Sequence, residues 1–140
     1  MTDGLSNEER AAVKARAKEL RDADRGKDKD EAALLKAIAE MDEPDRALAQ
    51  RIHAVVTAAA PELVAKTWYG QPAYARPGKG GKVVVFFRSG LKDKERYSSL
   101  GFSAEANLDE GGFWPTSYAV TDLDEAAEAA LFQLVKRAVS

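Results

Sequence analysis

Residues 82–88 read Lys-Val-Val-Val-Phe-Phe-Arg, and this short run decides the fold class of the chain. Five consecutive apolar residues, all β-branched or aromatic, are typical of a central β-strand that is covered on both faces. The segment Pro77-Gly78-Lys79-Gly80-Gly81 before it predicts a hairpin loop, and Ser89-Gly90 after it predicts a turn. We therefore expect this strand to lie in the middle of a sheet.

Four further short strands are predicted around this run. Two of them, at 66–70 and 72–76, precede it, a third spans 96–102, and the last lies near 117–120 after a glycine-containing loop. These segments carry β-branched or aromatic residues between glycine and proline positions that turn the chain. Because consecutive strands joined by short turns pair antiparallel, the sequence predicts an antiparallel sheet.

One amphipathic helix is predicted on each side of this strand-rich region. The first starts at Asp42-Glu43-Pro44, with an acidic cap and proline in the first turn, and ends near Ala60. The second starts at Asp122 or Asp124 and runs to Ala138. Their apolar residues recur at helical spacing: Leu48, Ile52, Val55, Val56 and Ala59, then Leu123, Ala127, Leu131, Leu134 and Val135. The order helix, strands, helix predicts a two-layer α+β domain, an antiparallel sheet flanked by helices.

A helical extension is predicted at residues 1–41, in front of the main domain at residues 42–140. Ser6 and Glu9 have the spacing of a capping box, which predicts a helix from there to about Arg21. The apolar stripe of this helix is thin, so the extension is expected to lie against the main body or to serve an interface.

The extension is predicted to contain a second helix. A charged stretch at 22–30 around Gly26 is expected to break the chain, and residues 31–41 then resume the helical spacing of apolar residues. We expect a monomer or, through the thin apolar stripe around Val13 and Leu20, a weak homodimer.

Composition limits the function classes. The chain has 140 residues, 45% of them hydrophobic, which is enough for one domain with a real core. It contains no cysteine, which excludes disulfides, thiolate metal sites and a cysteine nucleophile and suits a reducing compartment. The net charge of −2, the polar N-terminus and the lack of a long apolar run predict a cytoplasmic protein that binds neither nucleic acid nor membranes.

The charges are unevenly distributed along the chain. A basic block at residues 64–100 has eight basic and two acidic residues, whereas an acidic block at residues 101–140 has two basic and seven acidic ones. One interpretation is that the two blocks face each other across the sheet. The other is a basic rim around a pocket for an anionic group.

Carboxylates and one histidine are the conventional candidates for chemistry. Four acids crowd the start of the last predicted helix: Asp122, Asp124, Glu125 and Glu128. Acids at this position favour the helix macrodipole and cap its first turn, and the alternative is a surface site for iron. His53 lies in a predicted helix beside core positions and is interpreted as a half-exposed helical residue.

Aromatic residues are concentrated in the strand-rich half. The set comprises Trp68, Tyr69, Tyr74, Tyr97, Trp114 and Tyr118. These side chains could fill a core. Tyrosine and tryptophan also carry polar tips that need partners, so a cluster of them with Arg96 and Lys66 could instead line a pocket.

Four groups of residues in the strand-rich half form a distinctive pattern. They are Thr67-Trp68-Tyr69-Gly70-Gln71-Pro72-Ala73-Tyr74, then Gly81-Lys82-Val83-Val84-Val85-Phe86-Phe87, then Arg96-Tyr97 with Gly101-Phe102, and Asn107-Leu108-Asp109 with Trp114-Pro115-Thr116. Together they resemble the YdhG-like family of small bacterial domains of unknown function. The resemblance runs from about Met41 to the C-terminus. The N-terminal segment is similar to an extension on actinobacterial members.

This resemblance implies a helix-flanked antiparallel sheet. Some family members carry the label iron chaperone because the architecture is similar to that of frataxin, but a shared fold does not transfer a function. If the family has a common site, the resemblance places it at Trp68, Tyr69, Tyr74, Arg96, Tyr97, Asn107, Asp109 and Trp114. Gly70, Pro72 and Pro115 would shape the backbone there.

Three functional hypotheses follow. The first is a non-catalytic domain whose aromatic and basic sheet face binds a small anionic ligand or a protein partner. The second is a frataxin-like protein that binds iron through the acids of the last helix, with iron as the possible metal and no other cofactor implied. The third is an enzyme with a carboxylate such as Asp109 as general base.

Overall fold

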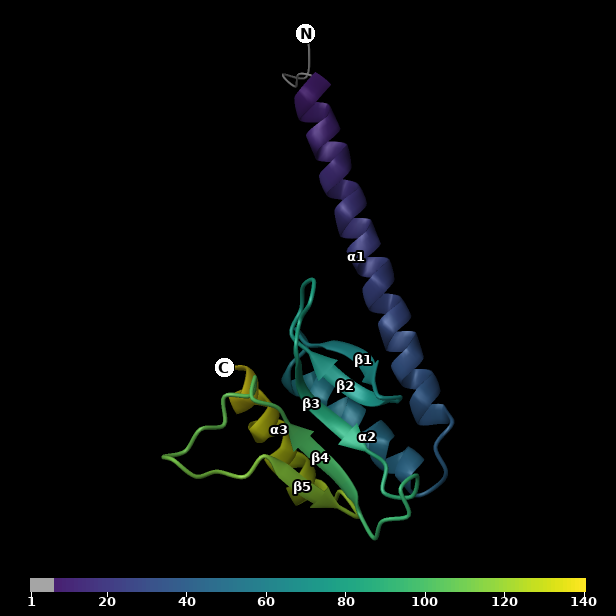
Figure 1. Cartoon of the computed structure of the whole chain (residues 1–140), viewed down its shortest axis with the longest axis vertical. Coiled ribbons are helices and arrows are strands. Elements are labelled where there is room, and N and C mark those ends of the chain that lie inside the picture. Colours follow the sequence, from purple (N-terminus) through teal and green to yellow (C-terminus); the bar gives the residue numbers. More distant parts are fainter. Residues whose placement is uncertain (1–6) are drawn as a thin grey trace.

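The computed structural model describes residues 7–140, apart from the side chains at positions 20 and 22–24 (Figure 1). Its elements are α1 (Asn7–Ala39), α2 (Asp45–Ala59), β1 (Val64–Trp68), β2 (Gln71–Ala75), β3 (Val83–Arg88), β4 (Ser98–Phe102), β5 (Ser117–Val120) and α3 (Glu125–Val139). The predicted α+β fold class is confirmed. Among residues 7–140, no helix combines the length and the apolar character needed to cross a bilayer.

The five strands form one antiparallel sheet in the order β1-β2-β3-β4-β5. Each strand pairs with the next one along the chain, so short turns are enough to connect them. The apolar run Val83–Phe87 lies in β3, and its predicted central position is confirmed. A bulge follows Tyr74, where Ala75 lies opposite Val83 instead of Val84.

The two faces of the sheet differ. On the inner face, Tyr74, Val85 and Phe87 are buried in one cluster with apolar residues of the helices, including Ile52 and Val135. Figure 1 shows α2 and α3 behind the sheet, side by side, with no described helix across the face toward the viewer. We call that second face the outer face.

The prediction that the central strand is covered on both faces is wrong at Phe86. Its side chain points to the outer face, where it remains partly exposed. Apolar residues on both faces of a strand do not require two covering layers, because an aromatic side chain can also be covered by its neighbours on the same face.

The N-terminal region also differs from the prediction, since α1 is one continuous helix through the expected break at 22–30. Gly26 costs a helix only about 1 kcal/mol, and the stretch also contains alanine, arginine and two lysines, which are good helix formers, so it does not end the helix despite its four aspartates. Only the last turns join the core, through Leu34 and Ile38. The N-terminal part projects away from the body in Figure 1. The predicted cap at Ser6 lies outside the described residues.

The helix starts are specified by acidic side chains. Asp124 caps α3 as predicted, because its carboxylate accepts a hydrogen bond from the amide of Ala127 at 2.8 Å. At α2 the prediction is corrected: Pro44 is the N-cap residue and does not lie within the first turn. The Glu43 carboxylate accepts instead from the amide of Ala47 at 3.3 Å.

Candidate functional site

The turn between β1 and β2 presents two aromatic rings to solvent. Tyr69 and Gly70 connect the paired residues Trp68 and Gln71, with φ angles of 52° and 74°. Two successive positive φ angles are the signature of a tight hairpin turn that normally contains asparagine or glycine at both positions. Tyr69 adopts this conformation although its side chain disfavours it, and the ring is 84% exposed. Its centroid lies 5.0 Å from that of Trp68.

Phe86 continues this aromatic surface across the outer face. Its ring meets that of Trp68 edge-on, with centroids 5.1 Å apart. It also lies over Gly101, where a Cβ atom would come within 2.3 Å of the ring. Gly101 therefore leaves the space that lets Phe86 lie flat on the sheet. We call Trp68, Tyr69 and Phe86 the aromatic patch.

The aromatic patch lines a pocket of about 340 Å³, which we call the aromatic pocket. Gln71, Phe87, Arg88, Lys92 and Asp93 complete its wall. Arg88 is neutralised locally, since its guanidinium donates to the Asp93 carboxylate at 2.7 Å and also contacts Glu95. The hydrogen bond to Asp93 and the charges of both acids raise the pKa of Arg88.

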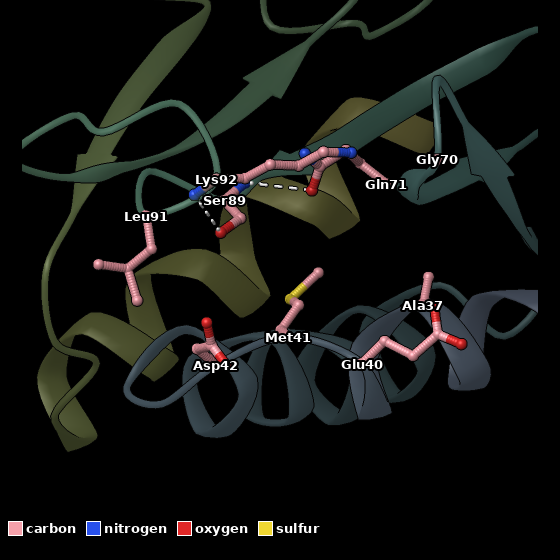
Figure 2. Close-up of a pocket in the computed structure, with 9 residues that line it drawn as sticks. All are labelled: Ala37, Glu40, Met41, Asp42, Gly70, Gln71, Ser89, Leu91 and Lys92. Carbon is pink, nitrogen blue, oxygen red and sulfur yellow. Dashed lines mark hydrogen bonds between the residues drawn. The ribbon is translucent and has the colours of Figure 1, made fainter.

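Lys92 is the cation that remains available in this wall. No acidic side chain of the described chain lies within ion-pair distance of its ammonium group. Lys92 also lines a second pocket of about 330 Å³, together with Gln71. This second pocket, which we call the helix-end pocket, lies between the end of α1 and the ends of β2 and β3 (Figure 2).

A buried carboxylate fixes the loop that carries Lys92. Asp45, in the first turn of α2, is only 5% exposed and accepts hydrogen bonds from the Ser89 hydroxyl and from the amide of Leu91 at 3.1 Å. The Ser89 amide donates to the Gln71 side chain at 3.2 Å. The base of this loop is thus tied both to α2 and to β2, so the shared wall of the two pockets is built in advance of any ligand.

Of the eight residues that the resemblance implies for a site, the structure brings only two into the aromatic pocket. Trp68 and Tyr69 are neighbours in the aromatic patch. Tyr74 lies on the opposite, inner face, where its hydroxyl is 2.9 Å from Nδ1 of His53. Burial, and then the charge of Glu31, raise the pKa of the Tyr74 phenol. Burial lowers the pKa of His53, which is the partly exposed helical residue that the sequence predicted.

The other implied residues lie in separate places. Arg96 stacks over the Tyr97 ring, 5.3 Å from its centroid, and both line a smaller pocket beside the start of α2. Asn107 donates to the carbonyl of Ser140 at 2.7 Å and so holds the end of α3. Two residues are left. Asp109 is exposed on a loop, and Trp114 packs against the core.

Sequence reasoning missed Phe86, Gln71 and Lys92. The first two could have been found from the register. A two-residue turn at Tyr69-Gly70 pairs Trp68 with Gln71, and alternation along β2 and β3 then places Phe86 on the same face. Lys92 lies in a loop whose position is set by Asp45, and no local pattern indicates that contact.

The acids at the start of α3 are occupied in other ways. Asp124 is the helix cap, while Asp122 and Glu128 lie 3.5 and 3.9 Å from the guanidinium of Arg51. Glu125 is exposed in the first turn. Within the residues that the structure describes, no three histidine or acidic side chains are grouped to hold a metal ion. This arrangement gives the iron hypothesis no built site.

The basic and acidic blocks are linked by a single described ion pair. Lys82 and Glu105 lie 3.6 Å apart, and no other ion pair in the described part of the chain joins residues 64–100 to residues 101–140. Mutual neutralisation across the sheet therefore accounts for little of the charge asymmetry. The second sequence interpretation, a basic rim, agrees better with this arrangement.

A scan of protein-family models and searches of curated proteins and of solved structures find nothing that matches this chain. The resemblance to the YdhG-like family rests on its motifs alone and stays a prediction.

Proposed function

We propose that this chain is a non-catalytic binding domain that holds a small molecule with an aromatic ring and an anionic group in the aromatic pocket. The observation that carries the proposal is the position of the aromatic patch. Two exposed aromatic side chains and the partly exposed Phe86 lie side by side on the one sheet face that no described helix covers, next to a lysine that has no ion pair among the described residues.

The energetics of the patch favour a ring as ligand. Aromatic rings in contact gain about 0.5–1.5 kcal/mol beyond the area that they bury. Trp68 and Tyr69 keep 40% and 84% of their surface exposed, so a ligand ring that covers them would gain both terms. A pocket of about 340 Å³ is in the size range of small-molecule sites, which favours a small ligand over a broad protein interface.

The conformation of Tyr69 supports a role for its ring. Asparagine or glycine would form the same turn without the steric cost that tyrosine has at positive φ. Bulky residues held in this region often occur at binding sites, where the surrounding structure maintains them. A tyrosine that fills no part of the core and remains exposed at such a position is best explained by contact with a ligand.

The lining of the aromatic pocket explains why we propose binding and not catalysis. Its one acid, Asp93, is bound to Arg88, and no histidine, serine or threonine is among the residues that line it. The carboxylate considered as a general base, Asp109, is exposed on a distant loop and has no positioning partner among the described residues. A reaction would need at least a positioned base or nucleophile.

Calorimetric titration with two aryl carboxylates, hydrocinnamate and naphthoate, tests the proposal. We expect the native chain to bind at least one of them. Trp68→Ala should abolish that binding and Tyr69→Ala should weaken it. Tyr97→Ala is the matched control, because it removes another exposed tyrosine outside the patch. Absence of binding by the native chain, or unchanged binding after Trp68→Ala, would disprove the proposal.

A further inference from the structure

The aromatic pocket and the helix-end pocket share a wall. Gln71 and Lys92 line both of them, and Gly70 of the helix-end pocket directly follows Tyr69 of the aromatic patch. A ligand that occupies the aromatic pocket and contacts Lys92 therefore has the helix-end pocket next to it.

The helix-end pocket has walls of opposite charge. Figure 2 shows Lys92 and Gln71 along its upper wall and Glu40, Met41 and Asp42 along its lower wall. The two carboxylates lie at opposite ends of the lower wall, with the Met41 side chain between them, and Lys92 lies on the opposite wall. This arrangement differs from that of the aromatic pocket, whose single acid is bound to an arginine.

Both carboxylates can accept an additional cation. Glu40 forms one ion pair, with Lys36 at 3.9 Å, and both of those side chains are more than 60% exposed. Such exposed pairs contribute little and are easily exchanged. The Asp42 carboxylate has no ion pair or hydrogen bond within the described chain. An amine placed here would be the partner that Asp42 lacks and an alternative to Lys36 for Glu40.

Resting on the proposed function, we infer that the two pockets form one bipartite site for a zwitterionic small molecule that carries an aromatic ring. The ring lies on the aromatic patch, the ligand's carboxylate meets the ammonium group of Lys92, and its amine meets the acidic lower wall that contains Glu40 and Asp42. Aromatic amino acids and close analogues have this combination of groups.

The arrangement also predicts selectivity. A ligand with the carboxylate but no amine would leave Asp42 unpaired and Glu40 with only its exposed pair to Lys36. An amine with no carboxylate would leave Lys92 unpaired. Hydrogen bonds to charged groups contribute more than neutral ones, so each missing group should lower affinity about tenfold. Because Asp45 fixes the Lys92 loop, little of this energy is spent on ordering the wall.

The test compares three probes by calorimetric titration of the full chain: free phenylalanine, hydrocinnamate, which lacks the amine, and phenethylamine, which lacks the carboxylate. We expect phenylalanine to bind about tenfold more tightly than either analogue. Equal affinities of phenylalanine and hydrocinnamate would overturn the bipartite site and leave the proposed function standing. If none of the three binds, both proposals are overturned.

Two variants assign the charges. Lys92→Met should weaken phenylalanine and hydrocinnamate about tenfold and spare phenethylamine, and Lys94→Met, two residues further along the same loop, is its control. The double variant Glu40→Gln and Asp42→Asn should weaken phenylalanine and phenethylamine and spare hydrocinnamate, with the remote Glu62→Gln as control. Uniform weakening of all three probes in either variant would contradict the assignment.

Discussion

The two faces of the sheet contain similar residues but differ in what they contact. The inner face buries Tyr74, Val85 and Phe87 under the helices, at 1% exposure or less. On the outer face, Phe86 and Trp68 contact each other and remain partly open to solvent. Burial in the core explains the presence of the inner aromatic residues, because it stabilises the fold. Burial does not explain the exposed aromatic residues on the outer face, and this difference points to a ligand.

Alternation along the strands creates this difference. Trp68 and Tyr74 are six residues apart in one sequence motif, but the turn between them reverses the chain and Tyr74 ends on the other face. Side chains that are close in the sequence of a hairpin therefore need not share a surface. A one-residue change of register would exchange the two sets, so the register determines which aromatic residues can meet a ligand.

The largest expected effect separates the neighbours Phe87 and Phe86. Phe87→Ala should lower the free energy of unfolding by about 3–5 kcal/mol, because it leaves a cavity in the core. Phe86→Ala should cost about 1 kcal/mol, since its ring is only partly buried. Denaturant unfolding of both variants measures the difference. Equal losses would contradict the assignment of the two faces.

The sequence predicted the fold well but only part of the candidate site. The apolar run of β3, the glycine turns and the helix spacing are local signals, and they yield the strand order because each strand pairs with the next. The site depends on contacts between distant residues. Lys92 is positioned by Asp45, which lies far from it in the sequence. The continuity of α1 was missed because the stretch at 22–30 contains a glycine and four aspartates, which are poor helix formers, yet the helix runs through them.

The second prediction concerns the packing of the outer face. Gly101→Ala would place a Cβ atom 2.3 Å from the Phe86 ring and should destabilise the chain by about 1–3 kcal/mol as the ring is displaced. The loss should be much smaller when Phe86→Ala is already present. Unfolding of the two single variants and the double variant forms a thermodynamic cycle. Strictly additive losses would show that the ring does not lie on this glycine.

The third prediction uses the polar pair of the inner face as a pH probe. Burial lowers the pKa of His53 below 6.5 in the folded chain, while the charge of Glu31 acts in the opposite direction. The unfolded chain therefore binds the proton more readily. The contribution of His53 to stability should be constant above about pH 6.5, fall as the pH decreases toward its folded pKa, and level off below that.

Unfolding of the native chain and of His53→Gln between about pH 7 and pH 5 isolates this contribution from that of the acids. The difference in unfolding free energy between the two chains should shift against the native chain as the pH falls. A difference that is independent of pH would mean that His53 titrates alike in the folded and unfolded chains.

The smallest expected change in stability completes the comparison between the faces. Trp68→Ala removes the two ring contacts, with Tyr69 and Phe86, of a side chain that is 40% exposed, and should cost about 1 kcal/mol while abolishing aryl carboxylate binding. Tyr74→Phe removes only the hydroxyl that meets His53, and should cost about 1–2 kcal/mol while leaving binding unchanged. Unfolding and calorimetric titration of both variants give the two measurements. If Tyr74→Phe also lost the ligand, the inner face would contribute to binding. In that case the division between a face for stability and a face for recognition would have to be given up.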